Sequence, residues 1–324
     1  MAAQKDWAFP TEMRPKPEDW RFDLDHALDA VVLVRSEIPD DAFTAPILGT
    51  ERAGNGVVIN ESGLVLTIGY LITEASVIWL ATNKGTVVGG YPLGYDQNTG
   101  FGLVQPLGKL GVKPIERGSA SSLRVGENVV VAGHGGRAHA LKATVFAKRE
   151  FAGYWEYVLD EALFTAPAHP QWGGSALIGA DGKLAGIGSL LVQEKIDAST
   201  LQGNMIVPVD LLAPILDDMT KTGRASRAPR PWLGMYATEA GERLVVAGLA
   251  PGAPAERAGI RVGDAVIEVG GAKPSSLADL WRRVWAHGAP GAIVPLKLGR
   301  SGKVIEARLT SADRADFLKK PHLH

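Results

Sequence analysis

The chain of 324 residues contains no cysteine. Disulfides, thiol nucleophiles and thiolate metal sites are therefore excluded. The cellular compartment stays open, because an exported protein can also lack cysteine. An excess of charge of one sign is lacking too, since the formal net charge is −1. Composition therefore gives no electrostatic reason to expect nucleic acid or an anionic membrane as the main partner.

Long apolar segments are also scarce. The N-terminus has no apolar stretch after Lys5, so it does not resemble a secretory signal. If the sequence is the whole gene product, this predicts a cytoplasmic protein. The most apolar window, Gly63–Thr82, has the length of a membrane span, but Glu74 in its middle argues against one. We expect no membrane span.

The N-terminal arm, residues 1–27, is polar but holds four aromatic residues: Trp7, Phe9, Trp20 and Phe22. One interpretation is that the arm packs on its own domain. The other is a contact in an oligomer, because aromatic side chains on a polar segment often carry the binding energy of an interface.

From Ala27 to about Pro208, short β-type runs alternate with Gly, Asn and Asp, and no long helical pattern lies between them. This predicts an all-β barrel or sandwich over residues 28–222 rather than a parallel α/β sheet. Apolar residues at helical spacing predict a helix at Asp210–Thr222 that ends at Gly223. Residues 223–231, which include the sequence RASRAPRP, predict a linker.

A second domain is expected over residues 232–312, followed by a C-terminal tail over 313–324. It contains the sequences WLGM at 232–235, GLAPGAPAERAGIRVGDAVIEVGG at 248–271 and SLADLWRRV at 276–284. Together these resemble a PDZ domain of the HtrA/Deg kind, with a helix at Ser276–His287. PDZ domains add a peptide to the edge of a sheet and hold its terminal carboxylate in backbone N–H groups.

The resemblance implies a site for the C-termini of proteins or for unfolded peptides. Gly234 suits the point where the backbone must approach the carboxylate closely, and Met235–Thr238 suits the edge strand. The helix residues either line the groove or only fill the core. The peptide-binding candidates are Trp232, Leu233, Gly234, Met235, Leu280, Trp281 and Val284.

Residues 28–222 resemble the trypsin-like protease domain of the HtrA/Deg family. The resemblance rests on GNGVVI at 54–59, GLVLT at 63–67, DQNT at 96–99, PQWGGSAL at 170–177 and the late strand at 203–208. It implies a mainly β protein, in which a trypsin-like double β-barrel is followed by a smaller α+β PDZ domain.

All three catalytic positions implied by this resemblance are replaced. Tyr70 stands where the family has histidine, Gly100 where it has aspartate, and Gly173 where it has the nucleophilic serine. The triad needs a hydroxyl, an imidazole to accept its proton and a carboxylate to orient the imidazole. Glycine supplies no side chain, and tyrosine is a poor base near neutral pH because its ordinary pKa is about 10. The sequence therefore predicts a degenerate domain without catalytic residues.

Two further possibilities remain within the nucleophile loop. Ser175 with His169 could form a substitute dyad, although Ser175 is displaced two positions from the nucleophile. The backbone N–H groups of Gln171 and Gly173 could still form an oxyanion nest, which needs no side chain. The seven histidines have no paired metal-binding spacing, so neither a metal nor another cofactor is expected.

The sequence therefore predicts an HtrA-like pseudoprotease that recognises exposed C-termini or unfolded segments as a chaperone-like, adaptor or regulatory protein. The alternative is a serine-type endopeptidase with a rebuilt active site. The family resemblance and the aromatic arm together predict a homotrimer.

Overall fold

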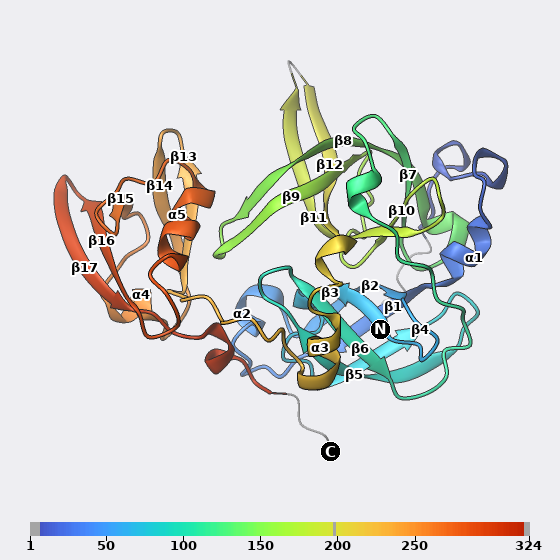
Figure 1. Cartoon of the computed structure of the whole chain (residues 1–324), viewed down its shortest axis with the longest axis horizontal. Helices are drawn as coiled ribbons and strands as arrows, with labels where there is room; N and C mark the ends of the chain where they lie inside the picture. The colour runs from blue at the N-terminus through green and yellow to red at the C-terminus, as the bar shows by residue number, and fades with distance from the viewer. Residues whose placement is uncertain (1–6, 197–198, 321–324) are drawn as a thin grey trace. The chain divides into compact units, whose positions relative to one another are not determined.

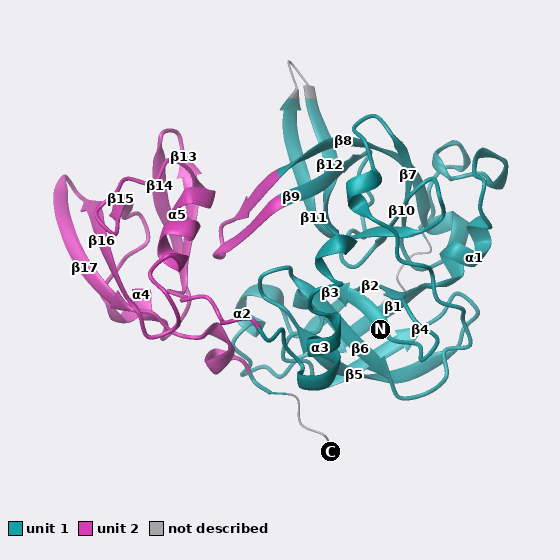
Figure 2. Cartoon of the chain, viewed as in Figure 1, with its two compact units in different colours: residues 1–149, 161–226, 319–324 teal, residues 150–160, 227–318 magenta. Residues whose placement is uncertain are grey.

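The computed structural model describes residues 7–196 and 199–320. The chain forms two compact units, shown in teal and magenta in Figure 2. The first comprises residues 1–149, 161–226 and 319–324, and the second comprises residues 150–160 and 227–318. Residues 150–160, which the sequence analysis assigns to the protease-like domain, thus cluster with the second unit.

The first unit begins with a closed six-stranded barrel in the order β1-β2-β3-β6-β5-β4 (Figure 1). Side chains alternate between the buried interior and the surface along the second half of β1, where Val34 and Ser36 are buried and Arg35 is exposed. The strands are β1 (Val31–Glu37), β2 (Glu51–Val58), β3 (Val65–Ile68), β4 (Val77–Ala81), β5 (Val87–Tyr95) and β6 (Phe101–Pro106).

A second closed barrel follows in the order β10-β11-β12-β9-β8-β7. Its core is made of small and branched apolar side chains, among them Val129, Val131 and Ile206. The predicted double β-barrel is therefore confirmed. The strands are β7 (Asn128–Ala132), β8 (Ala140–Gly153), β9 (Tyr157–Ala166), β10 (Ala176–Ile178), β11 (Leu184–Ile196) and β12 (Ser199–Pro208).

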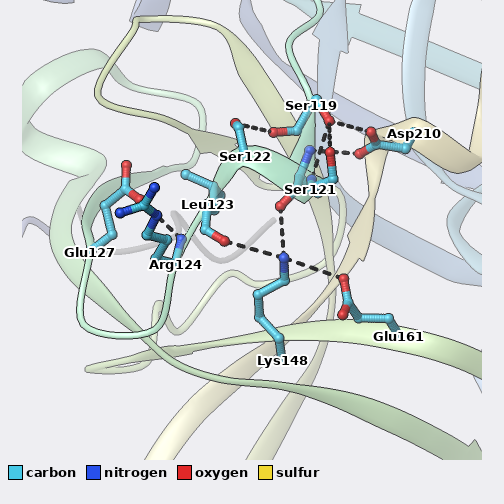
Figure 3. A network of polar contacts seen from close by, with 10 residues as sticks. Ser119, Ser121, Ser122, Leu123, Arg124, Glu127, Lys148, Glu161 and Asp210 are labelled. Carbon is cyan, nitrogen blue, oxygen red and sulfur yellow. Dashed lines mark hydrogen bonds and ion pairs between the residues drawn. The ribbon is translucent and has the colours of Figure 1, made fainter.

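A polar network fixes the loop before β7 to the second barrel (Figure 3). The Asp210 carboxylate accepts hydrogen bonds from Ser119 Oγ and from the Ala120 N–H, the latter at 2.6 Å. Lys148 donates to the carbonyls of Ala120 and Leu123, both at 3.2 Å, and pairs with Glu161 at 3.3 Å. Lys148 on β8 and Glu161 on β9 thereby secure the base of the β8–β9 hairpin within the first unit.

The helix predicted at Asp210–Thr222 is present only in its second half. A 3₁₀ turn, Val209–Leu211, is followed by α3 (Leu216–Thr222). Pro214 has no N–H and disfavours helical geometry in the residue before it, which explains the interruption. The predicted end is confirmed, because Gly223 has a φ of 79° and its N–H donates to the Met219 carbonyl.

The remaining helices of the first unit are short. They are α1 (Leu24–Asp29), α2 (Ala45–Leu48) and the 3₁₀ turns Thr11–Met13, Pro17–Asp19, Gly69–Leu71, Ala120–Ser122 and Gly136–His139. Over residues 7–196 and 199–320, no helix has the length and apolarity that crossing a bilayer requires.

The second unit is a five-stranded antiparallel sheet in the order β13-β14-β15-β16-β17, with β13 at one edge. Ser276 caps α5 by accepting the Asp279 N–H at 3.1 Å, so the predicted helix begins one residue later and ends at Trp285. The elements are β13 (Met235–Ala240), β14 (Arg243–Leu249), α4 (Pro254–Arg257), β15 (Ala265–Val269), α5 (Leu277–Trp285), β16 (Ile293–Arg300), β17 (Lys303–Thr310) and a 3₁₀ turn, Arg314–Phe317.

Candidate functional site

The structure brings the three triad-equivalent positions to one region of the first unit. The Tyr70 hydroxyl donates to the Ser189 carbonyl at 2.8 Å, and a Cβ added to Gly173 would lie 2.8 Å from that hydroxyl. The Gly100 carbonyl accepts the N–H of Gly69 at 2.7 Å, directly beside Tyr70. Gly100 has a φ of 82°, a conformation that favours glycine over aspartate.

Tyr70 is unsuited to act as a base in this setting. Burial raises the pKa of its hydroxyl above the ordinary value, so the group stays neutral. The hydroxyl proton is directed at a backbone carbonyl rather than at a neighbouring nucleophile.

Asn55 on β2 holds the nucleophile loop in place, and the sequence analysis did not single it out. Its backbone N–H donates to the Gly173 carbonyl at 2.8 Å, and its side-chain amide donates to the carbonyls of Gln171 and Gly173 at 2.9 and 3.2 Å. Its side-chain oxygen accepts the His134 N–H at 2.8 Å. This side chain is almost fully buried, and it fixes the loop through backbone groups alone.

The substitute dyad of Ser175 and His169 is not formed, although both residues are described and fully buried. Ser175 Oγ donates to the Trp172 carbonyl at 2.9 Å. His169 Nδ1 accepts the Gln171 N–H at 3.1 Å, and its Nε2 lies 2.9 Å from the His139 carbonyl. Both side chains therefore form hydrogen bonds with backbone groups and not with each other.

The burial of the His169 ring is a second reason why this residue is unsuited to catalysis. Its ring lies 5.1 Å from the Phe9 ring and 5.7 Å from the Trp7 ring, measured between centroids. Burial lowers the pKa of His169 to about 4, despite the hydrogen bond to the His139 carbonyl. An imidazole that binds a proton so weakly is a poor general base near neutral pH.

One of the two donors of the predicted oxyanion nest is already engaged. The Gln171 N–H already donates to the His169 ring, so a substrate carbonyl would have to displace that imidazole. The expectation that Gln171 and Gly173 together offer free donors is wrong for this conformation. The acceptor of the Gln171 N–H is the buried His169 ring, and the sequence pattern did not reveal this hydrogen bond.

A cleft of about 520 Å³ lies beside these residues. Its lining is aromatic and imidazole-rich, and it includes Trp7, Tyr70, His134, His139 and Trp172. Trp7 belongs to the N-terminal arm, and its ring stacks on His139 with centroids 4.7 Å apart. The arm therefore packs on its own domain, as the first of the two interpretations predicts.

In the second unit, the loop Leu233–Met235 binds a carboxylate that belongs to this chain. The N–H groups of Leu233, Gly234 and Met235 donate to Glu156 Oε1 at 3.1, 2.7 and 3.1 Å. Gly234 has a φ of 70°, and a Cβ there would lie 2.2 Å from Ala253 Cβ, so the loop requires glycine at this position. Glu156 is a site residue that the sequence analysis missed.

The other peptide-binding candidates contribute mainly to packing. Leu280, Trp281 and Val284 are fully buried in the core of the second unit, as the alternative interpretation predicts. Trp281 also donates from Nε1 to the Gly153 carbonyl at 2.9 Å. Trp232 forms a backbone bridge with Ala312, and its ring packs on Phe317. These contacts hold the residue that directly precedes the loop Leu233–Met235.

Comparison with known proteins agrees with this architecture. A model of the trypsin-like peptidase domain matches residues 54–187, and a model of the PDZ domain matches residues 231–310. The serine protease PepD of Mycobacterium tuberculosis is 29% identical over 80% of this chain and 60% of its own length. The periplasmic pH-dependent serine endoprotease DegQ of Escherichia coli is 26% identical over 89% of this chain and 69% of its own length.

Solved structures show the same fold. The HtrA-type protease AlgW with a tripeptide matches with a TM-score of 0.52 and 18% identity, covering 93% of this chain and 99% of AlgW. The serine endoprotease from Yersinia pestis matches with a TM-score of 0.52 and 21% identity, covering 90% of this chain and 98% of that one. The fold is thus a trypsin-like double barrel followed by a PDZ domain. The two domain matches and the named relatives support the resemblance to the HtrA/Deg type.

Proposed function

We propose that this protein is an HtrA-like pseudoprotease that binds exposed C-termini or unfolded segments through its PDZ domain. It would act as a chaperone-like, adaptor or regulatory protein. The observation that carries the proposal is the loop Leu233–Met235, whose three N–H groups converge on one carboxylate. Three such donors recognise a carboxylate whether it comes from a side chain or from a chain terminus.

The first unit lacks the side chains that hydrolysis requires. Gly173 offers no nucleophile, Tyr70 cannot accept a proton, and Gly100 cannot orient a base. The one serine in the loop, Ser175, is buried and donates to a carbonyl. The named relatives are serine proteases, which favours the rebuilt-site alternative, but their names do not supply the missing side chains in this chain.

The proposal predicts carboxylate-dependent peptide binding. A suitable probe is a fluorescein-labelled hexapeptide FAGYWV, which repeats residues 151–155 and ends in valine, so its terminal carboxylate can take the place of the Glu156 carboxylate. We expect the full chain to bind the free acid with an affinity in the micromolar range or weaker, because a short strand buries little area. Fluorescence polarisation measures the affinity, and the C-terminally amidated peptide is the control. Equal binding of the two peptides would contradict recognition of the carboxylate.

A further inference from the structure

The tip of the β8–β9 hairpin belongs to the PDZ unit. Residues 150–160 cluster with residues 227–318, and the tip has the sequence FAGYWEY at 151–157. Val158 is part of the buried core of this unit, and Ala152 packs against the same core. Figure 2 shows the tip in the colour of the second unit. The tip is therefore anchored to the core of the domain, although the Tyr154 side chain is 49% exposed.

Glu156 occupies the position of a ligand carboxylate in this domain. Its side chain is 5% exposed, and Leu233 donates to Oε2 at 3.2 Å in addition to the three bonds to Oε1. A buried carboxylate is costly unless donors surround it, and here the backbone loop supplies them. The loop is thus filled by a group from its own chain.

One backbone hydrogen bond joins the tip to the edge strand β13. Two residues before Glu156, the Tyr154 carbonyl accepts the Ala237 N–H at 3.0 Å, and Ala237 lies two residues beyond Met235 on β13. Residues 154–156 form the turn of the hairpin, so the tip contacts this edge of the sheet as a turn and not as a further strand. A peptide that joins a PDZ sheet at this edge would compete with the tip for the Ala237 N–H and for the loop Leu233–Met235. Gly153, one residue further back, accepts from Trp281 on α5.

The turn conformation indicates that the Glu156 side chain itself matters. Glu156 has a φ of 60°, a left-handed conformation that glycine or asparagine adopts at lower cost. Its four hydrogen bonds to the loop offset this local strain. The ion pairs from Arg282 to Glu150 and Asp160, both at 2.5 Å, are largely exposed, so they add little to the docking.

We propose that the hairpin tip is an internal ligand that closes the PDZ groove, so that a C-terminal peptide binds only after displacing Glu156 from the loop Leu233–Met235. This inference rests on the proposed function and describes how peptide binding to the PDZ domain would be regulated. When only a fraction of molecules has an open groove, the apparent affinity for peptide falls by that fraction. Release of the tip therefore controls how strongly the domain binds its targets.

The test compares full-length wild type with Glu156→Gly and Ser301→Gly. Glycine suits the turn at position 156 and removes the competing carboxylate. Ser301 also has a left-handed φ of 50°, in the turn between β16 and β17, so Ser301→Gly makes the same backbone change elsewhere in the unit. We expect Glu156→Gly to bind the free-acid FAGYWV peptide at least tenfold more tightly than wild type, and Ser301→Gly to match wild type.

A second readout follows the tip directly by hydrogen exchange. Saturating wild type with the peptide should increase exchange over residues 151–157 while the amides of 233–237 stay protected. Without peptide, Glu156→Gly should expose the amides of 233–235 relative to Ser301→Gly. Equal peptide affinity in wild type and Glu156→Gly, or an unchanged exchange at both segments, would overturn the inference. Peptide binding by neither protein, with the amides of 233–235 still exposed in peptide-free Glu156→Gly, would instead refute the proposed function.

Discussion

At the scale of single residues, two glutamates in the described part of the chain adopt a left-handed conformation and accept hydrogen bonds from several backbone N–H groups. Glu74 has a φ of 64°, and its carboxylate accepts from the N–H groups of Phe43, Thr44 and Lys319 at 2.7–3.0 Å. Glu156 does the same for the loop Leu233–Met235. A strained residue of this kind persists only where its side chain is held by its surroundings. The two sites differ in that the groups around Glu156 also form a loop able to bind a free terminus.

Gly173 allows a sharp prediction on catalysis. Wild type should show no hydrolysis of casein, and Gly173→Ser should restore none, because the new hydroxyl would have no base. The added Cβ would lie 2.8 Å from Tyr70 Oη, so we also expect a loss of about 1–3 kcal/mol in the free energy of unfolding. Casein hydrolysis, fluorophosphonate labelling read by mass spectrometry and urea unfolding measure these effects.

The control for that experiment is Ser175→Ala. Loss of a triad lowers kcat by about a millionfold in a true serine protease, so even weak turnover would be informative. Hydrolysis that Ser175→Ala abolishes, with the probe attached to Ser175, would favour the relocated nucleophile and count against the pseudoprotease.

At the scale of elements, the β8–β9 hairpin should respond to pH. Burial raises the pKa of Glu156 to about 7 from an ordinary 4.5, although the loop N–H groups and the charge of Arg314 act in the opposite direction. Tyr236, which also faces Glu156, has a pKa raised by burial and stays neutral. The docked tip therefore holds a proton more tightly than the released tip. Docking is strongest below about pH 4.5 and weakens as the pH rises through 7.

Hydrogen exchange of the amides of residues 233–235, corrected for intrinsic rates, measures this dependence between pH 5.5 and 8.5. We expect docking to weaken by at most about 3.4 kcal/mol across the whole titration, because burial raises the pKa from 4.5 to about 7. Glu156→Gln cannot titrate and should remove the dependence. A wild-type dependence that matches Glu156→Gln would show that Glu156 does not titrate in this range.

The same hairpin marks the limit of what the sequence could predict. Strands, glycine turns and the α5 cap follow from local patterns, so both barrels and the PDZ domain were predictable. No local sequence pattern predicts the hydrogen bonds between Glu156 and the loop Leu233–Met235. The loop lies 77–79 positions later in the sequence, and contacts over that separation depend on the folded path of the chain. The engagement of Gln171 by His169 was missed for a different reason: His169 is buried beneath an arm that begins far away in the sequence.

At the scale of the whole molecule, the predicted homotrimer must be reconciled with an arm that packs on its own barrel. The first part of the arm is fixed to its own unit, because Phe9 is 7% exposed and its N–H donates to the Ala138 carbonyl at 2.9 Å. Trp20 and Phe22 are only half-buried and lie 5.7 Å apart between ring centroids, so within the arm they are the pair of aromatics that we expect to contact another subunit.

We therefore expect the full chain to be a trimer and the double variant Trp20→Ala, Phe22→Ala to be a monomer that keeps its fold. Truncation to Asp25 is a harsher test, because it also uncovers His169 by removing Phe9. Phe9→Ala is the matched control: it should lower the melting temperature of the first unit while leaving the trimer intact, since the Phe9 ring is buried against His169 of its own unit. Light scattering gives the mass and calorimetry the melting temperature. A wild-type monomer at tens of micromolar would refute the trimer, and a trimer that survives Trp20→Ala, Phe22→Ala would place the interface elsewhere.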